Sequence, residues 1–329
     1  MSEFNIIKRY CQDLGKEHDE TRISVGDDAA VVSVPTGMEL AISVDTMVEG
    51  IHFFPDVDPA NLAHKLLAVN LSDMAAMGAE PKWATLALTL QDTSEAWLEA
   101  FSASLDKSAK RFGVQLIGGD TTQGPLTLSM QIMGLLPISK VLTRAGAKPK
   151  DDVYITNTIG DAGLALAYLQ QAKQLVDVDL TDKQIGRLTK ALELPEPQIE
   201  LGQALLSYAN ACIDISDGLV ADLSHIAKRS GVSIELDVNR VPLSEEYQSY
   251  VSQGGDLELA LTGGDDYQLA FTVEAKYTEQ LKALEKSSGV SLSKVGQVVE
   301  RTAEPVSLHT DGEEYKLNSL AGYQHFTES

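Results

Sequence analysis

The sequence predicts an α/β protein of two domains, each with helices layered on strands. The chain has 329 residues, more than one ordinary hydrophobic core holds, and this length suits two domains of roughly 150 residues each. Apolar runs typical of strands alternate with amphipathic runs typical of helices in both halves. A polar segment at 140–152 separates the halves. We therefore predict a boundary near residue 148, with domains 1–148 and 149–329.

The first half begins with a predicted amphipathic helix over 4–14, which Gly15 ends. Two strand-like runs, 29–34 and 39–44, are joined by a Pro-Thr-Gly turn and predict a hairpin. Asp58 is the expected N-cap of a helix that ends at Gly78. The other elements expected in this half are strands at 82–90, 114–117 and 126–136 and a helix over 94–112.

The second half repeats the alternation of strands and helices. A strand at 153–156 precedes a helix that begins after Gly160. The remaining predicted helices are at 182–192, 198–210, 219–228 and 276–286, and the remaining strands at 211–215, 232–236, 268–273 and 292–299. Short-period repeats and low-complexity segments are absent from the sequence.

Composition excludes several classes of protein. Hydrophobic residues make up 43% and the mean hydropathy is −0.08, so neither a disordered chain nor a membrane protein is expected. The net charge of −22 repels nucleic acid and anionic lipid, so we expect no nucleic-acid partner and no membrane partner. The first residues lack the pattern of a signal peptide, and the two cysteines form no CxxC motif. The expected compartment is the cytoplasm.

A turn of small residues that carries aspartate adjoins a strand-like run five times. One such turn is ordinary, because Asp and Gly are common turn residues. Five of them at strand ends favour a ligand site, because glycine permits close approach and a strand end fixes the direction of a carboxylate. The five turns are Gly26–Asp28, Ser43–Thr46, Gly118–Thr122, Asp214–Gly218 and Gly263–Asp266.

A sixth carboxylate, Asp73, lies in a run that is apolar almost all round the helix and therefore predicts burial. Asn70 and Asp73 are three residues apart and share one helix face. A buried ionised carboxylate must be paired or bound to a metal ion. Either a hydrogen bond or a basic neighbour from elsewhere in the chain neutralises Asp73, or a cation does.

Convergence of these carboxylates would require cations. Two ionised carboxylates about 4 Å apart repel by about 4 kcal/mol at an effective dielectric constant near 20. Oxygen ligands without a Cys/His cluster select hard ions, and Mg²⁺ shared with substrate phosphates suits such a site. The aspartates concerned are Asp28, Asp45, Asp73, Asp120, Asp214 and Asp217.

Other common sites are excluded or weak. The sequence contains no GxxxxGK[ST] phosphate loop, no HExxH and no GxSxG motif. The turn at 160–163 lacks the glycine spacing of a dinucleotide site and is interpreted as a plain strand-to-helix connection. His64 and His225 lie within predicted helices and are interpreted as packing or surface residues, whereas His52 follows the Asp45 turn closely and stays open to either interpretation.

Seven segments in order resemble the thiamine-monophosphate kinase family over nearly the whole chain. They are Gly26–Ala30, Ser43–Phe53, Asn70–Gly78, Gly118–Thr122, Leu142–Ala147, Asp214–Leu219 and Gly322–Phe326. The resemblance implies the fold shared with aminoimidazole-ribonucleotide synthetase and selenophosphate synthetase, in which the N-terminal sheets of two subunits form a homodimer. It also implies direct transfer of the ATP γ-phosphoryl group to thiamine monophosphate, yielding thiamine diphosphate.

The same resemblance implies residue roles. Several Mg²⁺ ions would be held by Asp28, Ser43, Asp45, Asp73, Asp120, Asp214 and Asp217. ATP would contact Gly119, Asp120, Arg144 and Ser216, and the thiamine phosphate would face His52, Asp265 and Tyr323. Two positions depart from the family pattern, because Asp265 stands where glutamate is frequent and Val44 where threonine is common.

Phosphoryl transfer needs in-line positioning and charge neutralisation more than covalent chemistry. The acceptor is itself an ionised phosphate, so no separate catalytic base is expected. Arg144 is expected to stabilise charge on the γ-phosphate. Two alternatives stay open: another ATP-using enzyme of the same fold, of the selenophosphate or aminoimidazole-ribonucleotide type, and a non-catalytic metal-binding maturation factor.

Overall fold

The computed structural model describes residues 2–172, 175 and 178–317. The chain divides into two compact units. The first runs to Met74 and includes Ala79–Val141, and the second includes Ala75–Gly78 and the chain from Leu142 onward. The segment expected to join the domains, 140–152, contains this division and leads into strand β7 (Asp152–Thr156).

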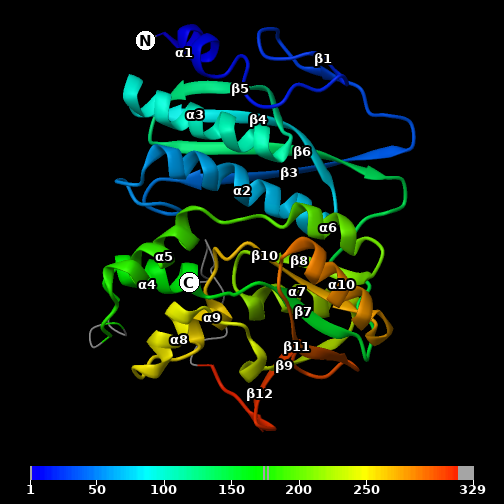
Figure 1. Ribbon diagram of the computed structural model, residues 1–329. Helices are drawn as coiled ribbons and strands as arrows, with labels where there is room; N and C mark the ends of the chain where they lie inside the picture. The colour runs from blue at the N-terminus through cyan, green and yellow to red at the C-terminus, as the bar shows by residue number, and fades with distance from the viewer. Residues whose placement is uncertain (1, 173–174, 176–177, 318–329) are drawn as a thin grey trace. The chain divides into compact units, whose positions relative to one another are not determined.

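The first unit contains a four-stranded sheet in the order β3-β6-β4-β5. Its strands are β3 (Met38–Val48), β6 (Thr127–Pro137), β4 (Glu80–Leu90) and β5 (Gln115–Gln123). Neighbours are antiparallel except β4 and β5, which are parallel. Helices α2 (Pro59–Met77) and α3 (Glu95–Phe112) lie along one face of the sheet (Figure 1). Strand β3 is therefore an edge strand with one face toward helices.

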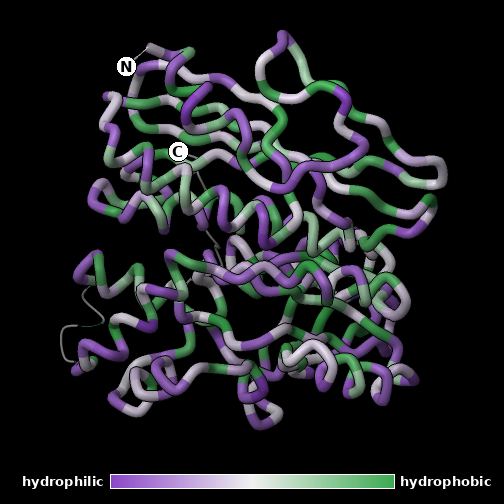
Figure 2. Tube along the Cα trace, turned by 45° about the horizontal axis from the view of Figure 1, so that its top comes forward, coloured by the Kyte–Doolittle hydropathy of each residue, from purple (hydrophilic) through white to green (hydrophobic). Residues whose placement is uncertain are grey.

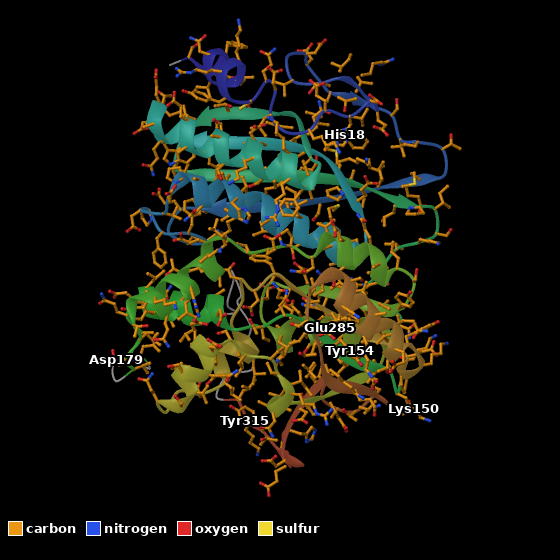
Figure 3. The ribbon with its side chains drawn as sticks, viewed as in Figure 1. His18, Lys150, Tyr154, Asp179, Glu285 and Tyr315 are labelled. Atoms are coloured by element: carbon orange, nitrogen blue, oxygen red, sulfur yellow. The ribbon has the colours of Figure 1, made fainter. Side chains whose placement is uncertain are left out.

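The ends of both helices confirm the predicted signals. The Asp58 carboxylate accepts a hydrogen bond from the Ala60 N–H at 2.8 Å, and Ser94 caps α3 by accepting from the Trp97 N–H at 3.4 Å. Gly113 follows α3 with φ of +73°, the left-handed conformation that ends a helix. His18, labelled in Figure 3, shares a 2.7 Å hydrogen bond with the carbonyl group of Gly113, which fastens the N-terminal segment to this turn.

The predicted hairpin of 29–34 with 39–44 is wrong. Strand β2 (Val31–Val32) pairs with β1 (Thr21–Ile23), and β3 pairs with β6 along its whole length from Met38 to Val48. Pairing along the whole of β3 gives hydrogen-bond partners to more backbone N–H and C=O groups than a short hairpin would. Val32 instead packs against the buried cluster around Trp83. Helix α1 (Glu3–Tyr10) is also shorter than predicted, and β5 extends six residues beyond its predicted end at residue 117, through the glycine pair to Gln123.

The second unit contains a seven-stranded sheet in the order β13-β12-β9-β11-β7-β10-β8. The strands besides β7 are β8 (Ala209–Ile215), β9 (Ser233–Asp237), β10 (Gln268–Val273), β11 (Leu292–Val299), β12 (Val306–Thr310) and β13 (Glu313–Glu314). The helices are α4 (Asp161–Leu169), α5 (Asp182–Glu193), α6 (Ile199–Leu205), α7 (Leu219–Ser230), α8 (Glu245–Ser252), α9 (Glu258–Thr262) and α10 (Thr278–Ser288).

Both faces of the central strands are buried, which explains their continuous apolar runs. On β7, Val153 and Ile155 join the core on the α7 side, whereas Tyr154 joins the core of α6 and α10. Tyr154, labelled in Figure 3, stacks on Phe271 of β10 with ring centroids 5.7 Å apart. Figure 2 shows hydrophobic stretches in the interior of the trace and many hydrophilic ones in the outer loops.

Most predicted elements of the second half are confirmed, with two differences. Helix α6 ends at Leu205, and β8 begins at Ala209, so the predicted helix over 198–210 is too long. Strands β12 and β13 and helices α8 and α9 were not predicted. They are short, and short elements leave little periodicity in a sequence. In the described ranges no helix has both the length and the apolar character that crossing a bilayer demands.

Candidate functional site

Strand β3 and helix α2 bring three predicted metal ligands together in the first unit. Ser43 and Asp45 are two residues apart on β3 and so point to the same face of the sheet. The Ser43 hydroxyl donates a short hydrogen bond to the Asp73 carboxylate on α2. Burial, and then the negative charge of Asp73, raise the pKa of Asp45 to about 6. Strand β3 and helix α2 therefore hold the carboxylates of Asp45 and Asp73 close together in partly buried positions.

Asn70 lies one turn before Asp73 on α2 and is fully buried. Its side-chain N–H donates to the Leu66 carbonyl oxygen at 2.9 Å, whereas its Oδ1 atom has no hydrogen-bond partner in the described part of the chain. A buried oxygen without a partner costs about 1–3 kcal/mol. A polar group bound on this face of α2 would remove that cost.

The donors of this region fit a hard divalent cation. They are carboxylate and hydroxyl oxygens, and burial and then the like charge of Asp73 raise the pKa of Asp45. Over the ranges that the structure describes, no three His, Cys, Asp or Glu side chains lie close enough to hold a metal ion by themselves. Bound phosphate oxygens would have to complete the coordination, as they do for Mg²⁺ in many nucleotide sites.

Asp28 and Asp120 lie on other elements of the first unit. Asp28 is exposed in the turn before β2, where its N–H donates to the Asp27 carboxylate at 2.9 Å. Asp120 is exposed on β5, the edge strand opposite β3, so three strand spacings of about 14 Å in total separate it from β3. Gly119, with φ of +155°, lets β5 approach β4 closely, because a Cβ there would lie 1.9 Å from the Leu86 carbonyl oxygen.

His52 lies in the turn that follows β3. Its Nδ1 atom accepts the Val48 N–H at 3.0 Å, and its own backbone N–H donates to the Val48 carbonyl oxygen at 2.9 Å. A neutral His52 ring therefore carries its proton on Nε2. Beside this turn is a cavity of about 170 Å³, lined by residues that include Glu49, Pro55 and Trp97, which the sequence did not predict.

In the second unit, the connection from β8 to α7 carries the other predicted ligands. Asp214 is buried near the end of β8, opposite Leu269 of β10. The N–H groups of Ser216 and Asp217 both donate to the Asp222 carboxylate, at 3.0 and 3.1 Å. Burial raises the pKa of Asp222 to about 7, although these two hydrogen bonds oppose the rise. The backbone of this loop is thereby held in one conformation.

Arg144 belongs to the same region of the second unit. It follows Thr143, whose carbonyl oxygen accepts the Cys212 N–H at 2.9 Å, and it precedes Gly146, whose N–H donates to Ser230 at 3.1 Å. Its charge acts on Asp222 and, together with burial, lowers the pKa of His225. Arg144 is thus an exposed cation beside the Ser216–Asp217 loop, as expected of a phosphate-binding arginine.

The turn that carries Asp265 packs against the same end of β8. The N–H of Asp265 donates to the Ser216 carbonyl oxygen at 3.0 Å, and the N–H of Tyr267 donates to the Ile215 carbonyl oxygen at 2.8 Å. The structure therefore brings Asp265 next to the predicted ATP residue Ser216. Tyr323, the third residue expected to face the thiamine phosphate, lies outside the described residues.

The sequence pointed to the loops but missed residues that support them, namely Asp222, Asp266 and Tyr267. Asp222 follows Gly218 at the start of α7 and resembles an ordinary first-turn acid. Asp266 ends the predicted turn and Tyr267 follows it, yet their partners are more than fifty residues away in Gly160 and Ile215. Their support of the loops depends on tertiary contacts, so the local sequence carried no signal for it.

Comparison with protein-family models defines the class. The model for the N-terminal domain of AIR synthase related proteins matches residues 26–136, and the model for the C-terminal domain matches residues 141–308. The two units thus represent the two domains of an AIR synthase related protein, with the ligand-bearing strand ends described above.

Comparison with individual proteins identifies the family within this class. Thiamine-monophosphate kinase of Escherichia coli is 44% identical over 324 residues, which cover 98% of each chain. The crystal structure of the same enzyme from Stenotrophomonas maltophilia is 39% identical with a TM-score of 0.82, covering 91% of this chain and 93% of that one. A structure described as AaThiL complexed with AMPPCP and TMP is 31% identical with a TM-score of 0.77, covering 92% of each chain. The chain belongs to the thiamine-monophosphate kinase family.

Proposed function

We propose that this chain is a cytoplasmic kinase that transfers the γ-phosphoryl group of ATP directly to thiamine monophosphate and releases thiamine diphosphate. The observation that carries the proposal is the group of Ser43, Asp45 and Asp73. Its two carboxylates repel each other, which fits a site for cations bound to phosphates. The family relationship supports the substrate, and the relative described with AMPPCP and TMP supports the pairing of nucleotide and acceptor.

The two proposed domains are assigned separate roles. Residues 1–148 would bind Mg²⁺ and ATP and form the dimer, and residues 149–329 would complete the active site. The proposed metal ligands are Asp28, Ser43, Asp45, Asp73, Asp120, Asp214 and Asp217. Several Mg²⁺ ions, when bound, would neutralise the charge on the phosphates. The chain's own contribution is to hold carboxylates on a rigid strand and helix, so that little reorganisation is needed on binding.

The ATP contacts proposed are Gly119, Asp120, Arg144 and Ser216. The close approach of β5 to β4 at Gly119 leaves backbone accessible next to Asp120. Arg144 is an exposed guanidinium beside the Ser216 loop, and a guanidinium keeps its charge at any physiological pH. We infer that Arg144 stabilises the charge of the γ-phosphate during transfer.

The acceptor contacts proposed are His52, Asp265 and Tyr323. With Nδ1 engaged by Val48, a neutral His52 presents Nε2–H, a donor suited to a phosphate oxygen. The acceptor phosphate is already ionised near neutral pH and attacks without a base. We therefore assign no separate catalytic base.

The proposal is tested by ADP release from ATP with Mg²⁺, measured with and without thiamine monophosphate. We expect release only when the acceptor is present, together with one thiamine diphosphate for each ADP. ADP release that depends on another acceptor would indicate one of the related ATP enzymes. Nucleotide binding without turnover would indicate a maturation factor, and either result would contradict the proposal.

We also propose that the chain forms a homodimer through the sheet of the first unit. Strand β3 is an edge strand whose outward side chains include Leu40, Ile42 and Val44, with 36%, 56% and 58% of their surface exposed. An apolar edge strand of this length favours pairing with another chain. Val44→Lys should convert the dimer to monomer in sedimentation analysis, and Leu169→Lys on the second unit is the control. A Val44→Lys protein of unchanged mass would contradict the proposal.

A further inference from the structure

The turn at Gly263–Tyr267 holds its backbone in an unusual conformation. Asp265 has φ of +69° and Tyr267 has φ of +49°, in the left-handed region that non-glycine residues seldom adopt. Such a conformation costs free energy and persists only where its surroundings impose it. Strain of this kind concentrates at functional sites, because it aims a side chain that a relaxed turn would direct elsewhere.

Three sets of contacts impose this conformation. The backbone N–H groups of Asp265 and Tyr267 donate to Ser216 and Ile215, so the turn is fastened to the end of β8. Gly264 packs so closely on the Ser216 carbonyl oxygen that a Cβ would lie 2.2 Å from it. The buried Asp266 carboxylate accepts the Gly160 N–H at 2.9 Å, which fastens the turn to the start of α4.

The two strained residues meet through their side chains. The Tyr267 hydroxyl donates a hydrogen bond to Oδ1 of Asp265 at 2.9 Å. Both side chains are partly exposed, so the carboxylate is held in one orientation while it remains accessible to a bound molecule. The hydroxyl leaves the carboxylate able to accept further hydrogen bonds, because an ionised carboxylate has about four acceptor positions.

We propose that Tyr267 is a positioning residue for the acceptor: its hydroxyl fixes the Asp265 carboxylate in the orientation that accepts a hydrogen bond from thiamine monophosphate. This inference rests on the proposed function, in which Asp265 faces the acceptor. Asp265 is one methylene shorter than the glutamate frequent in the family, so a fixed direction matters more here than for a longer, more mobile side chain.

The test is steady-state kinetics of Tyr267→Phe, which removes the hydroxyl and keeps the ring. We expect KM for thiamine monophosphate to rise about three- to tenfold, the loss expected for one hydrogen bond to a carboxylate. The kcat value and KM for ATP should change less than about twofold, because the Tyr267 hydroxyl is assigned to Asp265 and not to an ATP contact. A merely structural role would instead alter all three values together.

Two further variants make the test specific. Tyr208→Phe is the matched control, because Tyr208 precedes the other end of β8 and contacts Tyr277 rather than this turn. Asp265→Ala and the double variant Asp265→Ala with Tyr267→Phe should show equal KM values, since the hydroxyl acts through the side chain of residue 265. Effects that multiply in the double variant would overturn the inference.

The outcomes separate the two proposals. A wild-type protein without ADP release that depends on thiamine monophosphate would overturn the proposed function, and this inference with it. An active wild type with unchanged KM in Tyr267→Phe would overturn this inference alone. If Tyr267→Phe fails to fold, Asp265→Asn is compared with Asp265→Ala, because only asparagine keeps an oxygen that accepts from the hydroxyl. A smaller KM for Asp265→Asn supports the inference, and equal values overturn it.

Discussion

The acidic groups of the two units are built in opposite ways. In the first unit, Asp45 and Asp73 lie near each other on a strand and a helix. Burial and then the negative charge of Asp73 raise the pKa of Asp45. In the second unit, two buried acids of the loops accept backbone N–H groups: Asp222 accepts two of them and lies near Arg144, and Asp266 accepts the N–H of Gly160.

This difference indicates which unit needs a bound cation to offset the repulsion between its carboxylates. The loops of the second unit are satisfied by the chain itself, so they provide shape before any ligand binds. The carboxylates of the first unit are left with a repulsion that a bound cation would remove. Binding energy for metal-bound phosphates should therefore come mainly from the first unit, and alignment of the substrates mainly from the second.

Asp45→Asn gives the largest expected effect and tests the first half of this comparison. Loss of one carboxylate from a metal and phosphate site should lower kcat/KM by about 10²–10³-fold. The metal-free protein should nevertheless unfold at a higher temperature at pH 8, because a buried like charge has been removed. Asp13→Asn, an exposed carboxylate near α1, is the control for both measurements. Unaltered turnover in Asp45→Asn would break the comparison.

Gly218→Ala tests the second half, the rigid backbone of the β8–α7 loop. Gly218 has φ of +116°, and an added Cβ would lie 2.6 Å from the Thr262 carbonyl oxygen. We expect a loss of about 2–4 kcal/mol in the free energy of unfolding, measured with denaturant. Gly231→Ala is the control, because it shares a positive φ of +71° but has open space around it, and it should lose only about 1 kcal/mol. Equal losses would show that close packing at Gly218 is unimportant.

The smallest expected effect is on the pH dependence of the free energy of unfolding, and it sharpens the comparison for the second unit. Burial raises the pKa of Asp161, at the start of α4, from 3.8 to about 6. Its contribution to stability is therefore complete below pH 3.8 and is lost as the pH rises through 6. Asp161→Asn should avoid this loss and exceed the wild type by about 1–3 kcal/mol at pH 8, with the gain vanishing near pH 4. Asp182→Asn, an exposed acid at the first position of α5, should show no such gain.

Much of the fold was predictable because caps and periodicity are local signals. The Asp58 cap, the helical pattern over 94–112 and the glycine after α3 each gave a boundary within a residue or two. The partner of β3 was not predictable, because pairing with β6 joins segments about ninety residues apart and depends on which faces the helices cover. Proximity in sequence favoured a hairpin that the tertiary structure does not form.

The candidate site was predictable to about the same extent as the fold. The turn at the end of β8 located Asp214, and helix spacing located Asn70 and Asp73. The pattern at 43–46 located Ser43 and Asp45, but the predicted turn is wrong, because these residues lie inside β3 and pair with β6. The sequence could not give the strand order, which places Asp45 and Asp120 on the two edge strands of one sheet. Nor could it find Asp222 or Asp266, since buried acids that accept backbone N–H groups look like ordinary turn acids until their partners are known.

The central claim is that carboxylates of the first unit bind phosphates only through divalent cations. Calorimetric titration of the full chain with thiamine monophosphate and a non-hydrolysable ATP analogue tests it directly, with Mg²⁺ present and with Mg²⁺ removed by chelator. We predict binding heat only with Mg²⁺, and its loss in Asp45→Asn. Equal affinity in the presence and absence of Mg²⁺ would contradict the account.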